Sequence, residues 1–458
     1  MTASRPPALV EALGARVAGL AWEALPPDVV RMAQRCLLDT LGCALQGATT
    51  PEARRLAAAA EDLGARGPCT VWGTARTAPA PVAALLNGAH AHLRELDDIG
   101  GGGHASACQV PAALAAAELT GASGYQVLLG LVAGHEVSSR LTDAASYDTL
   151  TLRGWHTTGL YGSLGATAAA ARPLGLDARA TAHALGLCAS YTGGLWAFMA
   201  DGAMSKRLHP GKSAETALVA ATLARHGVTG PAWALEAEWG GLFPTCAPGE
   251  ARPEAIRERL DDGYRILKKG FKVHPVCWGI ASSADALLGL RAAHGLGADD
   301  VLRVRITLSE MSRRMIGGRR VESVLDAQMS LPWSVACILV RGRLTLAELD
   351  EPALGDPALR AAMDRVELIV DPQAHGERQT VEIETRDGRC LRDRVETPRG
   401  HWDAPLSDDE LRAKFLALAT PALGRAAAEV ADLVAALDRA PSLKPLLERL
   451  RPTAPTAH

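Results

Sequence analysis

Residues 28–46, DVVRMAQRCLLDTLGCALQ, carry the clearest structural signal in the sequence. The apolar residues of this stretch recur mostly at spacings of three and four: Val29, Met32, Ala33, Cys36, Leu37, Leu41, Ala44 and Leu45. That spacing places them on one face of an α-helix. The stretch therefore predicts a helix with one buried side.

Neighbouring stretches repeat this pattern and are separated by Gly and Pro, which predicts a mainly helical first part of the chain. The expected helices cover residues 51–64, 78–94, 106–120, 124–143, 160–172, 177–190 and 212–226. Most of them are apolar on nearly all sides, so some must lie deep inside a large helical domain. Aromatic residues make up only 4% of the chain, and we expect a core of small aliphatic side chains.

The pattern changes after about residue 265. Residues 301–309, 366–371 and 380–386 alternate apolar and polar residues, as half-buried strands do, and helices are expected at 279–293 and 326–341. After Pro405 the chain is helical again. With 458 residues the chain is long for one core. We expect a mainly α fold: a large all-helical domain (residues 1–266 and 401–458) and a smaller α+β lid domain (residues 267–400).

The composition limits the possible partners and compartments. The net charge of -3 gives no basic field for a nucleic acid. No apolar run reaches about 18 residues and no signal peptide is evident, so we expect a cytoplasmic protein without a membrane partner. The nine cysteines form no CxxC pair, which predicts reduced, buried thiols.

Residues 90–104, HAHLRELDDIGGGGH, combine two unfavourable features. Glu95, Asp97 and Asp98 gather at the end of a predicted helix, where the dipole disfavours negative charge. Four glycines follow and cost conformational order. Such a combination indicates function, with His104 as a proton carrier. The alternative is a solvated acidic turn.

Residues 153–162, RGWHTTGLYG, place His156 just before a predicted helix, with Thr157 and Thr158 as caps. The helix dipole would keep His156 neutral and able to accept a proton. A core histidine held by a backbone carbonyl is the alternative.

Residues 204–215, MSKRLHPGKSAE, gather four potentially cationic groups around Pro210 and Gly211, which we expect to open a helix. These groups are Lys206, Arg207, His209 and Lys212. A bound anion would relieve their conflict with the dipole, so the segment predicts a site for a substrate carboxylate, with Lys206 also able to donate a proton. A surface basic patch is the alternative.

Residues 268–278, KKGFKVHPVCW, stand at the proposed domain junction. Lys272 and His274 would share one face of an extended segment and could line a cleft, unless the segment is a solvated linker. A further basic group brackets Gly317 and Gly318 and could form a lid loop or a solvated turn: Arg313, Arg314, Arg319 and Arg320.

Other cofactor and nucleophile motifs do not occur. His90 and His92 are two apart on a predicted helix and would point to different faces, and no HExxH is present, so no metal is expected. Neither GxGxxG after a strand, nor GxxxxGK[ST], nor GxSxG occurs.

Six segments together resemble the MmgE/PrpD family, and they span most of the chain. They are LLDTLGCALQG (37–47), the ELDD segment that ends at His104, GWHTTG (154–159), SKRLHPGKSAE (205–215), FKVHPVC (271–277) and DAQMSLPWSVA (326–336). The family includes 2-methylcitrate dehydratases, cis-aconitate decarboxylases and iminodisuccinate epimerases. Ile99 and Ala281 differ from the family pattern, in which a threonine and a histidine are often found.

The resemblance implies a homodimer without a cofactor, with its site between a helical domain and a lid domain. It implies catalytic roles for Asp97 or Asp98, His104, His156, Lys206 and His274. We expect Glu95, Arg207, His209, Lys212 and Lys272 to bind a small carboxylate substrate.

The reaction implied is proton transfer beside a carboxylate. Dehydration is our first expectation, on the breadth of the family. Decarboxylation and epimerisation of a small polycarboxylate are alternatives, as is a non-catalytic relative that binds a small acid.

Overall fold

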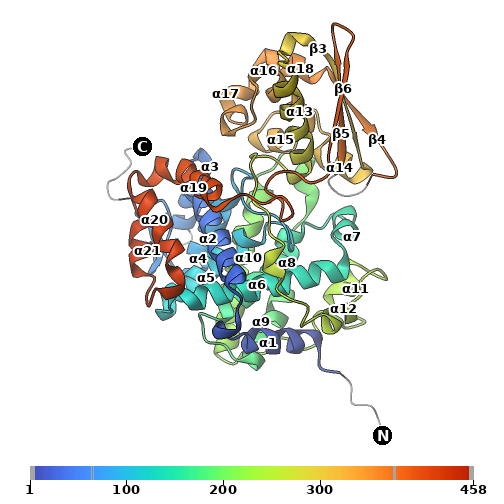
Figure 1. Cartoon of the computed structure of the whole chain (residues 1–458). Coiled ribbons are helices and arrows are strands. Elements are labelled where there is room, and N and C mark those ends of the chain that lie inside the picture. The colour runs from blue at the N-terminus through green and yellow to red at the C-terminus, as the bar shows by residue number, and fades with distance from the viewer. Residues whose placement is uncertain (1–5, 63, 65, 375–377, 453–458) are drawn as a thin grey trace.

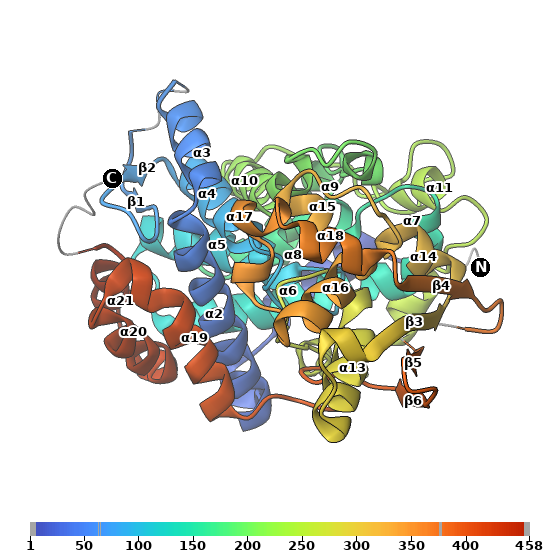
Figure 2. The same cartoon turned by 90° about the horizontal axis from the view of Figure 1, so that it is seen from above.

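The helix expected at residues 28–46 is α2 (Pro27–Ala48) in the computed structural model of the chain, which describes residues 6–62, 64, 66–374 and 378–452. One side of α2 packs on α4 (Ala80–His92), and another packs on the C-terminal helix α19 (Asp408–Leu423). Figures 1 and 2 both show α19 beside α2, so the last helices return to the body formed by the first half of the chain. The fold is mainly α with a smaller α+β part, as the sequence indicates.

The helical body contains most of the α-helices. The others before residue 260 are α1 (Leu9–Gly19), α3 (Pro51–Asp62), α5 (Ala105–Thr120), α6 (Gly124–Ala145), α7 (Tyr147–Leu152), α8 (Thr157–Ala171), α9 (Ala178–Ala189), α10 (Ser205–Arg225), α11 (Leu242–Cys246) and α12 (Glu254–Glu258). At the C-terminus α19 is followed by α20 (Ala426–Ala435) and α21 (Lys444–Arg449). A short hairpin, β1 (Cys69–Thr70) and β2 (Thr77–Ala78), joins α3 to α4.

Glycines allow α4 to lie very close to its neighbours. A Cβ atom on Gly211 would fall 2.1 Å from the carbonyl oxygen of Leu85, and one on Gly88 would fall 2.8 Å from the Cα of Gly211. On the other side, a Cβ on Gly47 would fall 2.0 Å from the carbonyl oxygen of His90. Real side chains cannot approach backbone that closely, so glycine is required where α2, α4 and α10 meet. This close packing brings the end of α4 beside the start of α10.

The α+β part contains a four-stranded sheet in the order β4-β3-β5-β6. Its strands are β3 (Val301–Leu308), β4 (Val366–Val370), β5 (Gln379–Thr385) and β6 (Cys390–Val395). β3 runs parallel to β4, with Val304 opposite Val366, and antiparallel to β5, with Val304 opposite Ile383. The first three strands match the alternating segments of the sequence. β6 has no buried residue, which is why the sequence gives no apolar signal for it.

Helices cover this sheet and connect its strands. They are α13 (Ala281–His294), α14 (Glu310–Ile316), α15 (Val324–Gln328), α16 (Leu331–Arg341), α17 (Glu351–Leu354) and α18 (Pro357–Met363). The helix expected at 326–341 is in fact two helices, because the Ser330 hydroxyl accepts a hydrogen bond from Trp333 N–H and Pro332 follows it, which starts a new helix. The helix α13 packs on β5 and β6.

Among the residues that the structure describes, two large clusters of buried apolar side chains lie beneath these elements, and a third contains only Cys43, Leu96 and Leu418. The larger cluster takes its residues from 9–271 and 406–450, and the second takes nearly all of its residues from 276–383. In Figure 1 the elements from α13 to β6 form the upper part, and α14 lies at its edge facing the helical body. The segment 268–280 and the segment after β6 connect the two parts.

Three other expectations can be compared with the structure. All nine cysteines are free, but Cys390 on the edge strand β6 is exposed and was wrongly expected to be buried. The helix expected to open at Pro210 begins at Ser205, and Pro210 lies inside it. Within the residues that the structure describes, no helix has the length and apolar character needed to cross a membrane.

Candidate functional site

Three helices begin at the wall of one cavity of about 380 Å³, which lies between the helical body and the α+β part. His104 is the N-cap residue of α5, His156 is the N-cap residue of α8, and Lys206 is in the first turn of α10. All three side chains line the cavity, together with Glu95. Helix N-termini carry partial positive charge and unpaired N–H groups, so their convergence favours an anionic ligand.

Glu95 forms ion pairs with two lysines. Its Oε2 contacts Lys206 Nζ and its Oε1 lies 3.0 Å from Lys272 Nζ. Glu95 has a φ of 52°, a conformation that a non-glycine residue adopts at a cost of about 1–3 kcal/mol. Burial alone would raise the pKa of the Glu95 carboxyl, but the two ammonium groups outweigh it and hold that pKa well below its usual value. Glu95 is therefore a permanent anion between two cations.

The two lysines differ in what remains for a ligand. Lys272 Nζ donates to Glu95 Oε1, to the Glu95 carbonyl and to the Val276 carbonyl, at 3.0, 3.0 and 3.1 Å. These bonds use all three of its protons. Lys206 Nζ donates to Glu95 and to His92 Nε2, the latter at 2.9 Å. One proton of Lys206 therefore remains for the cavity that it lines.

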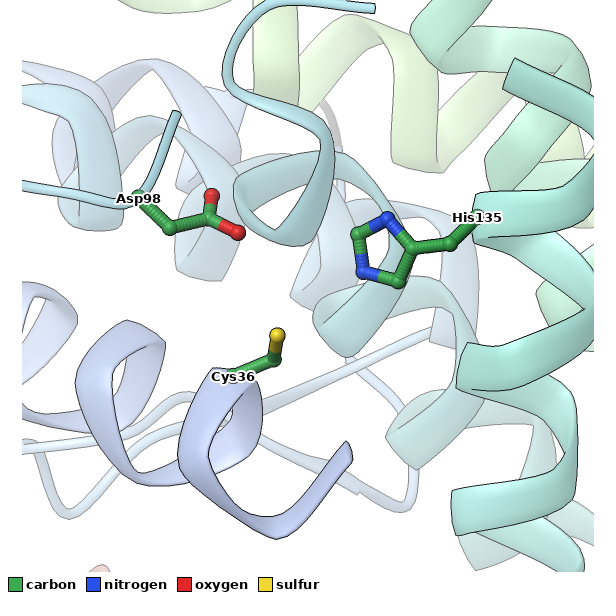
Figure 3. Close-up of side chains that lie close together, drawn as sticks. All are labelled: Cys36, Asp98 and His135. Atoms are coloured by element: carbon green, nitrogen blue, oxygen red, sulfur yellow. The ribbon is translucent and has the colours of Figure 1, made fainter. Parts of the chain in front are cut away.

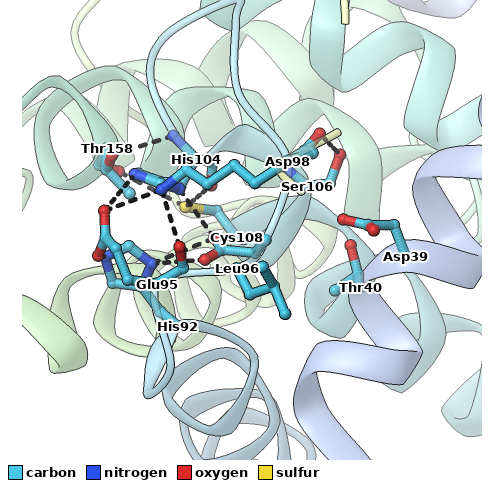
Figure 4. A network of polar contacts seen from close by, with 12 residues as sticks. Asp39, Thr40, His92, Glu95, Leu96, Asp98, His104, Ser106, Cys108 and Thr158 are labelled. Carbon is cyan, nitrogen blue, oxygen red and sulfur yellow. Dashed lines mark hydrogen bonds and ion pairs between the residues drawn. The ribbon is translucent and has the colours of Figure 1, made fainter. Parts of the chain in front are cut away.

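His92 joins Lys206 to a second buried carboxylate, and Figure 4 shows His92 beside Glu95 and His104. Its Nδ1 lies 2.9 Å from Asp97 Oδ1, while its Nε2 accepts from Lys206, so His92 is neutral with its proton on Nδ1. Burial lowers the pKa of His92 to about 3, and Lys206 adds to this effect against the pull of Asp97. The other carboxylate oxygen of Asp97 lies 3.0 Å from His104 Nδ1. Asp97 thus lies between two imidazoles: it is hydrogen-bonded to His92 and is close to His104, which faces the cavity.

The glycine run forms the loop between Ile99 and His104. Gly100, Gly101, Gly102 and Gly103 all have positive φ, between 59° and 102°. A Cβ on Gly103 would also lie 2.5 Å from Thr158 Oγ1. That hydroxyl accepts a hydrogen bond of 3.1 Å from the His104 backbone N–H, which ties the start of α5 to the start of α8. The loop therefore needs glycine both for its backbone conformation and for its contact with α8.

A histidine pair forms another part of the wall. His156 Nδ1 lies 2.7 Å from His209 Nδ1, so one nitrogen must donate and the other accept. Burial lowers the pKa of His209 to about 4, and burial with the nearby His209 and Lys206 holds the pKa of His156 well below its usual value. Both rings are neutral near pH 7, and Nε2 of His156 is left for the cavity. His209 itself lines a separate small pocket on the other side.

Asp98 points away from the cavity into the body. It lies 2.8 Å from Lys269 Nζ and also accepts from the Ser106 hydroxyl. Figure 3 shows Asp98 facing Cys36 of α2 and His135 of α6. Burial, helped by Asp98, raises the pKa of the Cys36 thiol to about 12, so the thiol keeps its proton. Lys269 also donates to the Gly100 carbonyl at 2.7 Å, so this buried pair positions the glycine loop.

Within the described part of the chain, two groups of side chains have the composition of metal ligands. They are Cys36, Asp98 and His135, and His92, Asp97 and His104, with candidate atoms within 4.8 Å of one another in each group. The first group already contains the ammonium of Lys269 beside Asp98, and the second contains that of Lys206 beside His92. A dication would be repelled by either ammonium. Each ammonium group instead stabilises the negative charge of the carboxylates near it.

The other residues expected at the site have different positions. Asp97 and Lys272 lie directly behind the cavity wall, and both hold residues that line it. Arg207 is buried and donates to the carbonyl of Leu93 and to Gln328, while Lys212 is exposed and pairs with Glu215. Arg207 and Lys212 therefore point to different partners and do not converge on one anion.

Lys272 and His274 do not share a partner or a cavity. His274 lies in the α+β part, with its Nε2 3.2 Å from Asp285 and its Nδ1 3.3 Å from the Leu344 carbonyl. The acidic segment is not a solvated turn either, because Glu95, Asp97 and Asp98 are at most 2% exposed. The arginines near Gly317 pair with Glu310, Glu322 and Asp326 or with backbone carbonyls, and none of these four side chains lines the cavity.

Several residues at the site were not found from the sequence. No role for His92 is predicted from the sequence, although its position three residues before Glu95 at a helix end links it to the acidic segment. Lys269 gave no signal of its own beside Lys268. The apolar wall of the cavity comes from segments far apart in the sequence, including Trp278, Met315 and Trp402.

Comparison with known proteins agrees with the two-part architecture of this site. The sequence matches the MmgE/PrpD N-terminal domain over residues 11–253 and the MmgE/PrpD C-terminal domain over residues 274–439. It is 30% identical to the cis-aconitate decarboxylase-like protein oryM of Aspergillus oryzae, over 86% of this chain and 87% of that protein. Identity to the cis-aconitate decarboxylase of Aspergillus terreus is 26%, over 94% and 93% of the two chains. Identity to the cis-aconitate decarboxylase of Homo sapiens is 28%, over 91% and 88%. With both domain families matched across the body and the α+β part, the chain belongs to the MmgE/PrpD family.

Proposed function

We propose that the chain is a lyase that transfers a proton at the carbon beside a carboxylate of a small carboxylic acid, with loss of CO2 as its first candidate reaction. The observation that carries this proposal is the convergence of His104, His156 and Lys206 at three helix N-termini around one cavity. The relatives named cis-aconitate decarboxylases favour decarboxylation.

Substrate binding follows from the free donors. A substrate carboxylate accepts a hydrogen bond from the remaining N–H of the Lys206 ammonium. It also accepts hydrogen bonds from the N–H groups at the start of α8, near Thr157 and Thr158, which line the cavity. These donors are fixed in place before the substrate arrives, because Glu95 and His92 hold Lys206. Preorganised donors stabilise negative charge that grows on the carboxylate during reaction.

The chemical step needs a charge sink and a proton donor. When the bond between carbon and the leaving carboxylate breaks, CO2 departs. The electron pair of the broken bond stays on the carbon and is delocalised into the retained carboxylate. A histidine then delivers a proton to carbon. His104 suits this role, since Asp97 lies 3.0 Å from its Nδ1 and stabilises the charged ring. The neutral His156 Nε2 suits the role of proton acceptor or hydrogen-bond donor.

Dehydration, the reaction expected first from the sequence, stays a second candidate for one reason. The cavity wall carries two separate proton-transfer groups, His104 and His156, and elimination of water needs both a base for the C–H proton and an acid for the leaving hydroxyl. Decarboxylation requires only the donor.

Proton NMR in deuterated water tests the proposal. The purified protein is incubated with citrate, cis-aconitate and related di- and tricarboxylic acids, and product signals are followed with and without a trap for CO2. Loss of CO2 with deuterium at the neighbouring carbon supports decarboxylation, and a new alkene without CO2 supports dehydration. A His104→Gln variant that folds and retains full turnover would refute the assigned roles.

A further inference from the structure

The two sides of the cavity differ in chemistry. The charged and polar groups, Glu95, His104, His156 and Lys206, come from the helical body. The side formed by the α+β part and its connecting segments is largely apolar, with Met311, Met315, Met329, Trp278 and Trp402 beside Ser312 and Cys277. A ligand that fills the cavity must therefore satisfy a polar side and an apolar side together.

The local sequence of α14 accounts for the apolar side. Met311 and Met315 are four residues apart and share the helix face that lines the cavity. Arg313 and Arg314 lie on the exposed face and pair with Glu310. The basic residues of this segment therefore point away from the ligand, and two flexible thioether side chains point towards it.

The charged groups around the cavity can balance only one or two carboxylates of a substrate. Of the described residues that line it, Lys206 is the only lysine or arginine, whereas Glu95, Asp143 and Asp148 carry carboxylates. Asp143 and Asp148 are exposed; Asp143 pairs with Arg265 at 3.3 Å, and Asp148 adds negative charge that an entering anion passes. Lys206 and Lys272 both pair with Glu95, and the nearby Asp97 adds a second buried carboxylate beside His92. A third substrate carboxylate would lie against tryptophan and methionine without a cation, which is costly.

We propose that the natural substrate is an amphiphilic acid, with one or two carboxylates at the Lys206 side and an apolar chain or ring against Met311, Met315, Trp278 and Trp402. This inference deepens the proposed function, on which its placement of the carboxylates rests. It differs from a tricarboxylate such as the cis-aconitate in the names of the relatives.

Binding of two unreactive, matched acids tests this inference without any turnover. Tricarballylate has three carboxylates, and 2-pentylsuccinate replaces one carboxymethyl arm with an apolar chain. Isothermal titration calorimetry of the whole protein should give 2-pentylsuccinate at least about tenfold tighter binding, since even one methylene in an apolar pocket is worth about tenfold or more. Equal or tighter binding of tricarballylate overturns the inference, as does a lack of measurable binding by 2-pentylsuccinate.

A Met315→Lys variant tests where the apolar chain of the ligand lies. It places a cation on the apolar side, so 2-pentylsuccinate should bind at least about tenfold more weakly and tricarballylate more tightly than to the wild type. Met199→Lys, a half-buried methionine that does not line the cavity, is the matched control, and circular dichroism checks that both variants fold. Unchanged affinity of 2-pentylsuccinate for Met315→Lys overturns the inference. Failure of turnover with every acid would count against the proposed function alone, because the binding preference is measured separately.

Discussion

Replacing Lys206 with methionine removes one charge and keeps nearly the same side-chain volume. Lys206 is 2% exposed, donates to Glu95 and His92, and has one proton left for the cavity. The Lys206→Met variant therefore separates two effects of the same ammonium group. It removes a partner of Glu95, which affects folding, and it removes a donor to the substrate, which affects the reaction.

The expected magnitudes follow from these contacts. Glu95 keeps Lys272 at 3.0 Å, so its charge is not left without a partner. We expect the free energy of unfolding to fall by about 1–3 kcal/mol, less than the about 3–5 kcal/mol that follows when a buried ion pair loses its only partner. Loss of one preorganised donor to a developing negative charge should lower kcat by about 10²- to 10³-fold.

The assay combines urea unfolding with steady-state kinetics on the acid that the wild type turns over. Lys212→Met is the matched control, since Lys212 lies on the same helix but is exposed and pairs with Glu215 at 2.7 Å. The control should change stability by less than about 1 kcal/mol and leave kcat unchanged. If Lys206→Met folds and turns over within about threefold of the wild type, the assignment of Lys206 to the substrate carboxylate is refuted.

Three further predictions concern the histidines and the glycine loop. Burial lowers the pKa of His90 to about 4 and that of His92 to about 3, so below their unfolded value of about 6.5 only the unfolded chain takes up their protons. The free energy of unfolding, measured with urea, should then fall as the pH drops below about 6.5, by about 1.4 kcal/mol per pH unit for each histidine. In the His90→Leu variant the slope should be smaller by the contribution of one histidine. A flat profile down to about pH 5 would contradict this prediction. His209→Phe should lower kcat about 10- to 100-fold with little change in KM, because His156 loses the partner that fixes its tautomer. His226→Phe, at the exposed end of α10, should leave kcat unchanged. Equal kinetics of the two variants would argue against this role of His209. Gly103→Ala should cost about 1–3 kcal/mol and reduce activity, since its φ is 89° and its Cβ would meet Thr158, while Gly121→Ala, with a φ of 68° and open space, should lose less stability and keep full activity.

Local pattern was sufficient for most elements of the fold. The three- and four-residue spacing in residues 28–46 predicts α2, and alternation predicts β3, β4 and β5, because one face of each element is buried in its own part of the protein. The edge strand β6 was missed since it buries no residue. The start of α10 was misplaced because proline usually opens a helix, whereas Pro210 lies inside α10, after the first turn.

The candidate site was only partly accessible to such reasoning. The unfavourable clusters around Glu95 and Lys206 indicated charged groups in need of partners, and the structure brings those two residues into contact across 111 positions of sequence. The expectation that a bound anion would balance the cations of α10 did not consider this partner: Glu95 of the protein balances Lys206.

Composition, periodicity and the order of a few motifs were therefore enough to establish a mainly helical MmgE/PrpD protein and a short set of ionisable residues. The tertiary structure alone decided which of those residues meet. Lys206 and Lys212 look alike in the sequence, but the close crossing of α4 and α10 at Gly88 and Gly211 turns the first towards Glu95 and leaves the second in solvent. Helical spacing is a property of neighbouring residues, whereas burial of a charge depends on partners that only folding brings near.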